Sequence, residues 1–353
     1  MTTLNQEWFN FQNSIKLNKP IENTISKTPK TKQKEMPKCS EIYISTQTKI
    51  AYLNKTIDLQ TVFWKLPMIQ YHQPTNGIIK KSIKISCHNP TQVEQMEKLI
   101  NQEKTIQVRI LQQRNIESIT KKFKDIRKID IGLCKKDLTT YRKKQKGAFY
   151  NCFALIIRIL YKNEYKEVHV KIFNTGKLEI PGIQYDDLLT ITLNNLINII
   201  KPYTYEDINY SKNDIQTVLI NSNFNCGFYI DRFKLFQTLK YTYNLHVGYD
   251  PCSYPGIQCK FCYHQDNTTH DGVYRKQDNL EEDKWKRISF MIFRTGSVLI
   301  VGNCNVQILH IIYEFLKKIL CNEYNQIAIT TNNVKKKKSK KKVRKKTILF
   351  TTE

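Results

Sequence analysis

Two copies of one short pattern decide the fold of this chain. The first copy reads Lys171-Ile172-Phe173-Asn174-Thr175-Gly176-Lys177-Leu178-Glu179-Ile180-Pro181-Gly182, and the second reads Met291-Ile292-Phe293-Arg294-Thr295-Gly296-Ser297-Val298-Leu299-Ile300-Val301-Gly302. Ile, Phe, Thr, Gly, Ile and Gly recur at a constant offset of 120 residues. Each copy predicts two strands joined by a tight Thr-Gly turn, because glycine supplies the positive φ that such a turn needs. The chain therefore contains an internal repeat.

The segments around the two hairpins repeat as well. Apolar residues at helical spacing predict a helix near 186–200 after the first hairpin and near 305–321 after the second. A strand at 42–53 precedes a short helix capped by Asp58, and a strand at 215–220 precedes a short helix capped by Asp231. Each half is thus predicted to be a strand, a short helix, several antiparallel strands and a long helix.

The first repeat is longer than the second. Asp58 and Asp231 are 173 residues apart, whereas the hairpins are 120 apart, so the first repeat holds about 53 additional residues. We place this insertion at roughly 78–146, with helices expected near 90–104 and 116–129. The insertion is strongly basic, and we interpret it as an arm on DNA, a partner-docking module or a solvated helical excursion. Its clusters are Lys121-Lys122, Lys135-Lys136, Arg142-Lys143-Lys144 and Lys146.

The predicted organisation has four parts. Residues 1–40 form a disordered tail, 41–203 the first repeat, 204–328 the second repeat, and 329–353 a basic disordered tail. Trp8, Phe9 and Phe11 are either a docking segment or an isolated apolar spot in the first tail. The lysine-rich run at 335–346 is a nuclear-localisation signal, a non-specific DNA arm or a solvated tail.

Bulk composition narrows the class of protein. The 353 residues carry a formal charge of +26, which favours a polyanion such as nucleic acid as the partner, although a lysine-rich surface from a biased genome is the alternative. The ten cysteines are scattered without a disulfide-framework pattern. We see no signal peptide and no apolar run near the roughly 20 residues that span a bilayer. We therefore expect a soluble protein in a reducing, intracellular compartment, without membrane partners.

Two such repeats can join edge to edge into one sheet with helices on a single face. The uncovered face should be polar unless it binds something. Alternation along 168–173 directs Val168, Val170 and Ile172 towards the helices, and His169, Lys171 and Phe173 outward. An outward Phe173, repeated as Phe293, is typical of a wedge that enters a base step in the minor groove. The alternative is an edge aromatic that folds over the hairpin end.

These motifs together resemble the TATA-box-binding protein family, and in particular the divergent members of large DNA viruses. Both hairpins resemble the family's Ile-Phe-x-Ser-Gly-Lys…Thr-Gly signature. Ile44-Ser45-Thr46 with Ile57-Asp58-Leu59-Gln60-Thr61 resembles the first strand and helix of the family. Tyr249-Asp250-Pro251 followed by Tyr254-Pro255-Gly256-Ile257 resembles its Tyr-Glu-Pro…Phe-Pro-Gly-Leu segment. The resemblance covers about 42–77 and 147–325.

The resemblance implies an α+β saddle of about ten antiparallel strands over four helices, whose concave face kinks the minor groove with two pairs of aromatic wedges. Phe173 and Phe293 match one wedge of each pair, and Tyr254 matches the second-repeat partner. The first-repeat partner falls at Cys152, with Phe153 or Tyr150 as substitutes. The residues expected to contact DNA are Ile44, Cys152, Phe153, Lys171, Phe173, Thr175, Lys177, Thr217, Leu219, Tyr254, Phe293, Thr295, Ser297, Leu299 and Val301.

Several positions depart from the family pattern. The family's two central asparagines fall at Ile42 and Thr217, and its hairpin threonines fall at Pro181 and Val301. Glu179 stands where the family has a valine. The family's turn lysine is kept at Lys177 and becomes Ser297 in the second copy. We therefore expect altered or weak sequence preference, since the minor groove mainly distinguishes A·T from G·C.

A cluster of metal-ligand residue types lies in the second repeat. Cys259 and Cys262 have zinc-ligand spacing, and Cys252 with His264 or His270 would complete four ligands. Separate thiols and surface histidines are the alternative. The sequence has no P-loop, paired-carboxylate or Ser-His-Asp pattern, so we do not expect an enzyme and expect no cofactor other than this zinc.

The sequence thus predicts a monomeric, virus-type transcription initiation factor. It would bend A·T-rich promoter DNA and present its other surfaces to a factor-IIB-like protein and RNA polymerase. Its expected location is the nucleus or the viral factory, or the virion as a packaged protein. Two alternatives stay open, namely a protein-interaction scaffold with weak DNA binding and a zinc-dependent nucleic-acid-processing protein.

Overall fold

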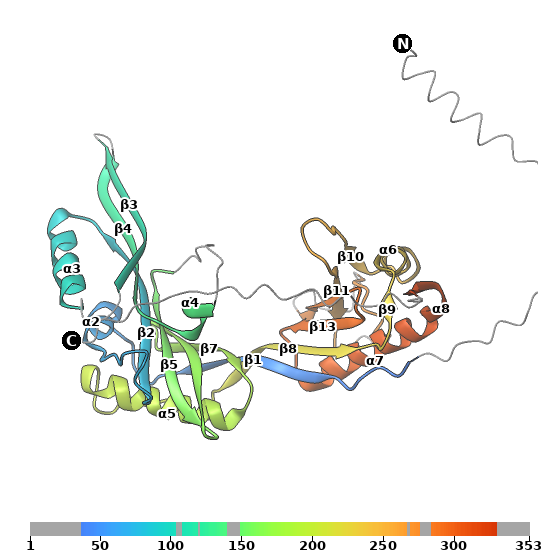
Figure 1. Ribbon diagram of the computed structural model, residues 1–353, viewed down its shortest axis with the longest axis horizontal. Helices are drawn as coiled ribbons and strands as arrows, with labels where there is room; N and C mark the ends of the chain where they lie inside the picture. Colours follow the sequence, from blue (N-terminus) through green and yellow to red (C-terminus); the bar gives the residue numbers. More distant parts are fainter. Residues whose placement is uncertain are drawn as a thin grey trace, which may run out of the picture. The chain divides into compact units, whose positions relative to one another are not determined.

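The computed structural model describes residues 37–103, 108–118, 121–139, 149–266, 269–275 and 284–329 (Figure 1). The chain divides into two units, 1–36 and 37–353, and the fold below belongs to the second. The predicted tails and the basic cluster at 142–146 lie outside the described residues, except for 37–40 at the start and 329 at the end. Within the described part of the chain, no helix has the length and apolar character needed to cross a membrane.

In the described part of the chain, twelve strands form one sheet in which all neighbours are antiparallel. Their order is β10-β11-β12-β13-β8-β1-β7-β6-β5-β2-β4-β3, and a separate pair joins β9 to β14. The strands are β1 (Tyr43–Tyr52), β2 (Gly77–Cys87), β3 (Val108–Ser118), β4 (Lys121–Gly132), β5 (Cys152–Tyr161), β6 (Glu164–Phe173), β7 (Lys177–Ile183), β8 (Gln216–Asn225), β9 (Tyr229–Ile230), β10 (His246–Gly248), β11 (Ile257–Tyr263), β12 (Lys286–Ile292), β13 (Ser297–Gly302) and β14 (Ala328–Ile329).

The two halves of the sheet have the same internal order. From β1 outward the strands are β7, β6, β5 and β2, and from β8 outward they are β13, β12, β11 and β10. At the junction Gln47 pairs with Ile220, Thr46 with Asn221 and Thr48 with Leu219. Equivalent residues of the two halves differ by 173 in number. Exchanging equivalent residues converts the Thr46–Asn221 pair into the Thr48–Leu219 pair and leaves the Gln47–Ile220 pair unchanged. A pseudo-two-fold axis therefore passes through the Gln47–Ile220 pair. The α+β class and the two pseudo-symmetric repeats are confirmed, with twelve strands rather than ten because β3 and β4 extend the first half.

Helices follow the repeat too. Asp58 accepts hydrogen bonds from the first turn of α2, and Asp231 from that of α6, as the sequence predicts. Asn305 caps the long helix α7 in the same way. The helices are α2 (Leu59–Lys65), α3 (Pro90–Gln102), α4 (Lys135–Thr139), α5 (Asp186–Ile200), α6 (Arg232–Gln237), α7 (Val306–Asn322) and α8 (Tyr324–Ile327), with short turns η1 (Lys201–Tyr203) and η2 (Thr238–Thr242).

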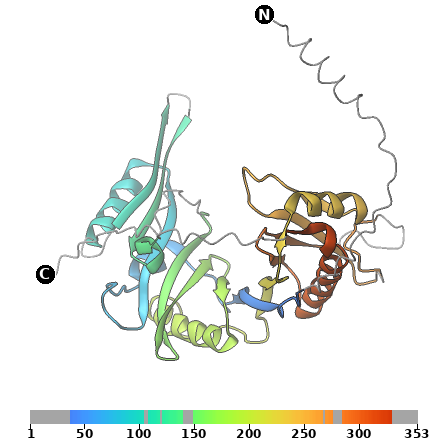
Figure 2. The same ribbon diagram turned by 45° about the vertical axis from the view of Figure 1, so that its right-hand side comes forward.

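One face of the sheet carries the core. On β6, Val168, Val170 and Ile172 are buried while Lys171 and Phe173 are half-buried, which confirms the predicted alternation. The long helices α5 and α7 lie beside the strands of their own halves (Figure 2), and their apolar stripes are buried. We call the side that buries Val170 and Ile172 the helix face, and the opposite side the open face.

The insertion differs from its prediction. The helix expected near 90–104 exists as α3, but the helix expected near 116–129 is wrong, because this stretch belongs to the hairpin β3–β4. The sequence of β4 lacks the apolar alternation typical of a strand, because the charged residues Asp125 and Arg127 occupy buried positions on its helix face. They form an ion pair of 2.9 Å. The segment 77–87 is β2, which occupies the place of β10 in the second half, so the additional residues begin after Cys87.

Both Thr-Gly turns are held by the preceding strand of their own half. Gly176 has φ +83° and its carbonyl accepts a hydrogen bond from Leu53 N at 2.9 Å. Gly296 has φ +80° and its carbonyl accepts from Cys226 N at 2.9 Å. A Cβ added at Gly296 would lie 2.3 Å from the Phe228 carbonyl oxygen. These two positions require glycine for both backbone conformation and space.

We expect Gly296→Ala to destabilise the protein by clearly more than Gly182→Ala. Gly182 has a similar φ of +86°, but a Cβ there meets nothing within 4 Å. The Gly182→Ala variant therefore measures the cost of backbone strain alone, about 1–2 kcal/mol, whereas Gly296→Ala adds the steric clash. Urea unfolding of both variants measures the difference. Equal losses would show that the close approach of strand and turn contributes nothing.

Candidate nucleic-acid interface

An aromatic pair is assembled on the open face of the second half. The rings of Tyr254 and Phe293 meet edge to face with centroids 5.9 Å apart. The Tyr254 hydroxyl donates to Met291 Sδ at 3.5 Å, which fixes the ring beside β12. A Cβ at Gly256 would lie 3.1 Å from both rings, so this glycine allows the loop to pass beneath them. The two residues predicted as the second wedge pair therefore pack against each other.

The first half holds its aromatic residues differently. Phe173 pairs with Cys152, whereas the neighbour of Phe293 across the sheet is Gly256, one residue before the Ile257–Ile292 pair. Cys152 thus corresponds to Gly256, and Tyr150, two residues earlier, corresponds to Tyr254. The placement of the wedge at Cys152 is wrong by two residues, and the register favours the substitute Tyr150.

Phe153 does not reach the open face. It is 1% exposed and packs edge to face against Phe63 of α2, with centroids 5.8 Å apart. Tyr150 is 47% exposed, with Lys84 Nζ 4.2 Å from its ring centroid. Phe173 has Lys177 Nζ at 5.6 Å. Tyr150 and Phe173 are thus each accompanied by a lysine in a cation–π arrangement.

The strand residues next to the wedges also differ between halves. In the first half Lys171 pairs with Glu179, and their charged groups are 2.6 Å apart. In the second half the equivalent pair is Met291 with Leu299. The first half therefore presents a neutralised ion pair where the second presents two apolar side chains. The other predicted contacts on these hairpins are partly exposed, namely Thr175, Lys177, Thr295, Ser297 and Val301.

Two predicted contacts at the centre lie on the wrong side of the sheet. Ile44 pairs with buried Ser222, and Thr217 pairs with buried Lys49, whose Nζ reaches Asp186 of α5 at 2.9 Å. Because paired residues share a face, Ile44 and Thr217 belong to the helix face. The cause is a bulge on each side of the pseudo-two-fold axis, which alternation in the sequence does not reveal.

The open face at the axis instead carries Thr46, Thr48, Leu219 and Asn221. Leu219 is 37% exposed, in agreement with its predicted place. Asn221 was missed, and its Oδ1 is buried without a hydrogen-bond partner among the described atoms. Asparagines at alternate positions of β8, Asn221 and Asn223, were the available signal that this strand presents amides to one face.

Part of the first-half open face is covered by residues 133–139, which include α4 and which we call the strap. Lys80 Nζ lies 2.8 Å from Asp130 and 3.0 Å from Asp137, and Arg109 Nη2 lies 3.0 Å from Asp137. The backbone N–H of Lys135 donates to Glu167 on β6 at 2.9 Å. These contacts fasten the strap to β2, β3 and β6.

The electrostatics of the strap depend on Asp137. Although burial opposes ionisation, hydrogen bonding to Cys134 and the charges of Lys80 and Arg109 hold the pKa of Asp137 well below its usual range. Burial and the Asp137 contact raise the pKa of the Cys134 thiol to about 11. The carboxylate therefore stays ionised and the thiol stays neutral at ordinary pH.

The predicted zinc ligands are not brought together. Cys259 pairs with buried Phe290 on the helix face, whereas Cys262 pairs with exposed Arg287 on the opposite face. Cys252 is exposed, and burial raises the pKa of the Cys259 thiol far above its ordinary value. His264 Nδ1 accepts a hydrogen bond from Asp266 N. Among the described residues, no group of three or more histidine, cysteine or acidic side chains is arranged to hold a metal ion.

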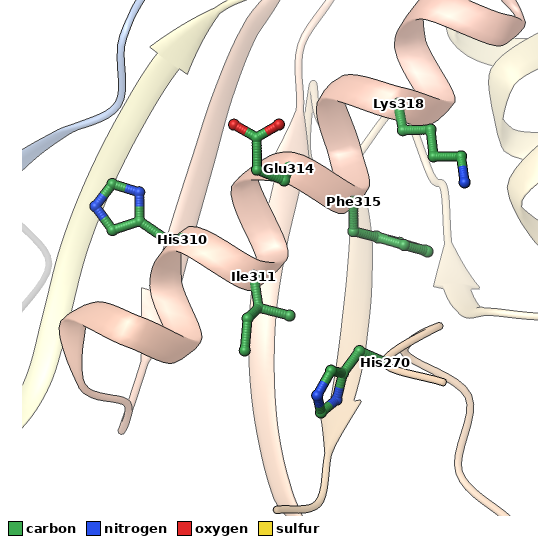
Figure 3. Close-up of a pocket in the computed structure, with 6 residues that line it drawn as sticks. All are labelled: His270, His310, Ile311, Glu314, Phe315 and Lys318. Carbon is green, nitrogen blue, oxygen red and sulfur yellow. The ribbon is translucent and has the colours of Figure 1, made fainter. Parts of the chain in front are cut away.

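A hollow of about 580 Å³ lies on the exposed side of α7, away from the open face. Figure 3 shows Ile311 and Phe315 on the side of the helix towards His270, while Glu314 projects from the other side. The hollow is lined by His270, His310, Ile311, Glu314, Phe315 and Lys318. It contains none of the residues predicted to contact DNA.

Comparison with known proteins gives one sequence relative and one structural neighbour of note. No family model matches the chain. The chain is 27% identical over 205 residues to a "TATA-box-binding protein-like" protein of Acanthamoeba polyphaga mimivirus, across 54% of this chain and 53% of that protein. The chain therefore matches about half of that relative's length. The Methanococcus jannaschii TBP structure aligns with 81% of this chain and 99% of its own, at 15% identity and a TM-score of 0.39.

The resemblance to a divergent viral protein of the TATA-box-binding type is confirmed by this relative.

The strap should loosen in acid through Asp137. Its folded pKa is below the ordinary 3.8, so its contribution to stability is present above that value and is lost as pH falls through and below it. We expect Asp137→Asn to be less stable than wild type at neutral pH and to lose less stability between about pH 5 and pH 2. Unfolding free energies from urea titrations across this range provide the measurement. The exposed Asp214→Asn serves as the control, and matching pH profiles for the two variants would contradict the role of Asp137.

Proposed function

We propose that this protein is a transcription initiation factor that places its open face in the minor groove of A·T-rich promoter DNA and bends the duplex. The observation that supports it most is the packed Tyr254–Phe293 pair, which lies on the open face of the second half together with apolar Leu299. Apolar wedges of this kind unstack a base step and bend the duplex towards the major groove. The sequence relative's name agrees with this function.

The strongly basic composition suits the proposed binding to DNA. A formal charge of +26 favours pairing with phosphates and release of their counterions, which makes affinity fall steeply with salt. Specificity would come from the flexibility of A·T-rich steps rather than from base-edge hydrogen bonds.

The two halves should not contribute equally to bending. Tyr254 and Phe293 are preassembled, so little order is lost when they insert. In the first half, the Lys171–Glu179 ion pair lies beside Phe173, and its desolvation in the groove would be costly. The second half is therefore the stronger kinking half in this proposal.

The remaining parts of the proposal concern partners and place. A monomer bound to bent DNA would offer its helices and hairpin turns to a factor-IIB-like protein and RNA polymerase, in the nucleus or a viral factory. Glu179 and the strap favour a second candidate, a protein-interaction scaffold with weak DNA binding, because both reduce the open surface of the first half that suits DNA.

Paired substitutions test the wedges. We expect Tyr254→Ala with Phe293→Ala to abolish most of the bend and to weaken binding by about one and a half to four orders of magnitude, at roughly 1–3 kcal/mol for each of the two stacking aromatics. Tyr150→Ala with Phe173→Ala should reduce the bend less. Fluorescence energy transfer between the ends of an A·T-rich duplex measures the angle, and a titration measures affinity.

Phe233→Ala is the matched control, since Phe233 is a 60% exposed aromatic on α6 and should leave both readouts unchanged. Unchanged bending in the Tyr254/Phe293 double variant would remove the wedge mechanism. A wild-type protein that binds no duplex at any salt concentration would instead favour the scaffold.

A further inference from the structure

The sheet is longer at one end than at the other. In the second half it ends at β10, which has three residues. In the first half β2 has 11 residues and is followed by β4 and β3, so the open face continues for two more strands. Any ligand that lies along the open face therefore meets additional protein surface beyond the first half only.

Three lysines lie on the open face of this extension, and one of them, Lys128, is buried. Lys84 on β2 pairs with Lys128 on β4, and both alternate with residues buried on the helix face, such as Ile85 and Arg127. Lys124 lies four residues from Lys128 on the same strand and therefore shares its face. Lys84 and Lys124 are partly exposed.

The strap adds two more lysines on the same side. Lys135 and Lys136 are exposed at the start of α4, which Asp137 fastens to the open face through Lys80 and Arg109. The fastening network balances its own charge, because Lys80 and Arg109 face the carboxylates of Asp130 and Asp137. Four lysines lie outside it, and we call them the edge lysines: Lys84, Lys124, Lys135 and Lys136.

The edge lysines lie next to the aromatic pair of the first half, Tyr150 and Phe173. Lys84 Nζ lies over the Tyr150 ring, and continuing the β2–β5 register places Lys84 opposite Cys152, the partner of Phe173. Continuing the β10–β11 register in the second half places Asp250 opposite Gly256, the counterpart of Cys152. The position next to the wedge is thus a cation in one half and a carboxylate in the other.

We propose that the edge lysines bind the phosphate backbone of duplex DNA that continues past the first wedge. The contact is one-sided, since the described residues of the second half include neither the added strands nor a counterpart of the strap. It lengthens the DNA footprint on the first-half flank and favours one orientation of the protein on its site. This inference rests on the proposed function, and it assigns a role to the insertion.

The test uses the full chain and a duplex with an A·T-rich core and long flanks. The quadruple variant Lys84→Ala, Lys124→Ala, Lys135→Ala, Lys136→Ala leaves Asp137 and its partners intact. Each lost phosphate contact lowers the slope of log affinity against log salt by about 0.9, so we expect a decrease of about 2–4. Hydroxyl-radical protection should shorten on one flank while the bend at the core persists.

A matched variant removes the same charge elsewhere: Lys98→Ala, Lys234→Ala, Lys240→Ala, Lys318→Ala, all exposed and carried by α3, α6, η2 and α7. We expect its salt slope to change by less than about 1 and its footprint to match wild type. Equal losses in both variants, or a wild-type footprint of equal length on both flanks, overturn the edge contact while the proposed function stands. Absence of any duplex binding by wild type overturns both.

Discussion

The antiparallel pairing of β1 with β8 is the constraint on which the rest of this structure depends. Each half alone would present a long edge strand with unpaired backbone groups, which is a site for aggregation. Pairing the two edges about the Gln47–Ile220 position satisfies both at once. Because the pairing is symmetric, it fixes the two hairpins at equivalent distances from the axis. The positions of Phe173 and Phe293 on the open face follow from this register.

The symmetry holds for the backbone and fails for the side chains. Both turns keep glycine at positive φ, and both are held by the strand that precedes the short helix. The open-face chemistry has diverged, with Met291 and Leu299 in one half and Lys171 and Glu179 in the other. Backbone packing constrains every position that touches the core, whereas an open-face residue is constrained only by what it binds.

Much of the fold could be predicted from local patterns. The hairpins, both aspartate caps, the long helices and the face of Phe173 follow from spacing that local physics enforces. The misplaced contact residues share one cause, since each placement depends on strand register. Because of bulges beside the axis, Ile44 and Thr217 lie on the helix face. The strand register makes Tyr150, and not Cys152, the equivalent of Tyr254.

Polar residues in buried places caused the remaining errors. Asp125 and Arg127 are buried as an ion pair, so β4 does not have the apolar alternation typical of a strand. Cys259 and Cys262 have the spacing of zinc ligands, but on an extended strand a separation of three directs them to opposite faces. The spacing rule for zinc assumes a turn between the two cysteines. Pairwise contacts between distant segments decide such cases, and a single sequence does not contain them.

The insertion changes what the first half is able to do. Its strap is fastened by Lys80, Asp130 and Asp137 over strands that the second half leaves open. Ion pairs buried in this way contribute fixed geometry more than net stability, because desolvation offsets much of their attraction. The strap covers part of the open face of the first half and carries the exposed Lys135 and Lys136. In the proposed function, the apolar pair of the second half kinks the duplex and the exposed lysines of the first half hold its phosphate backbone.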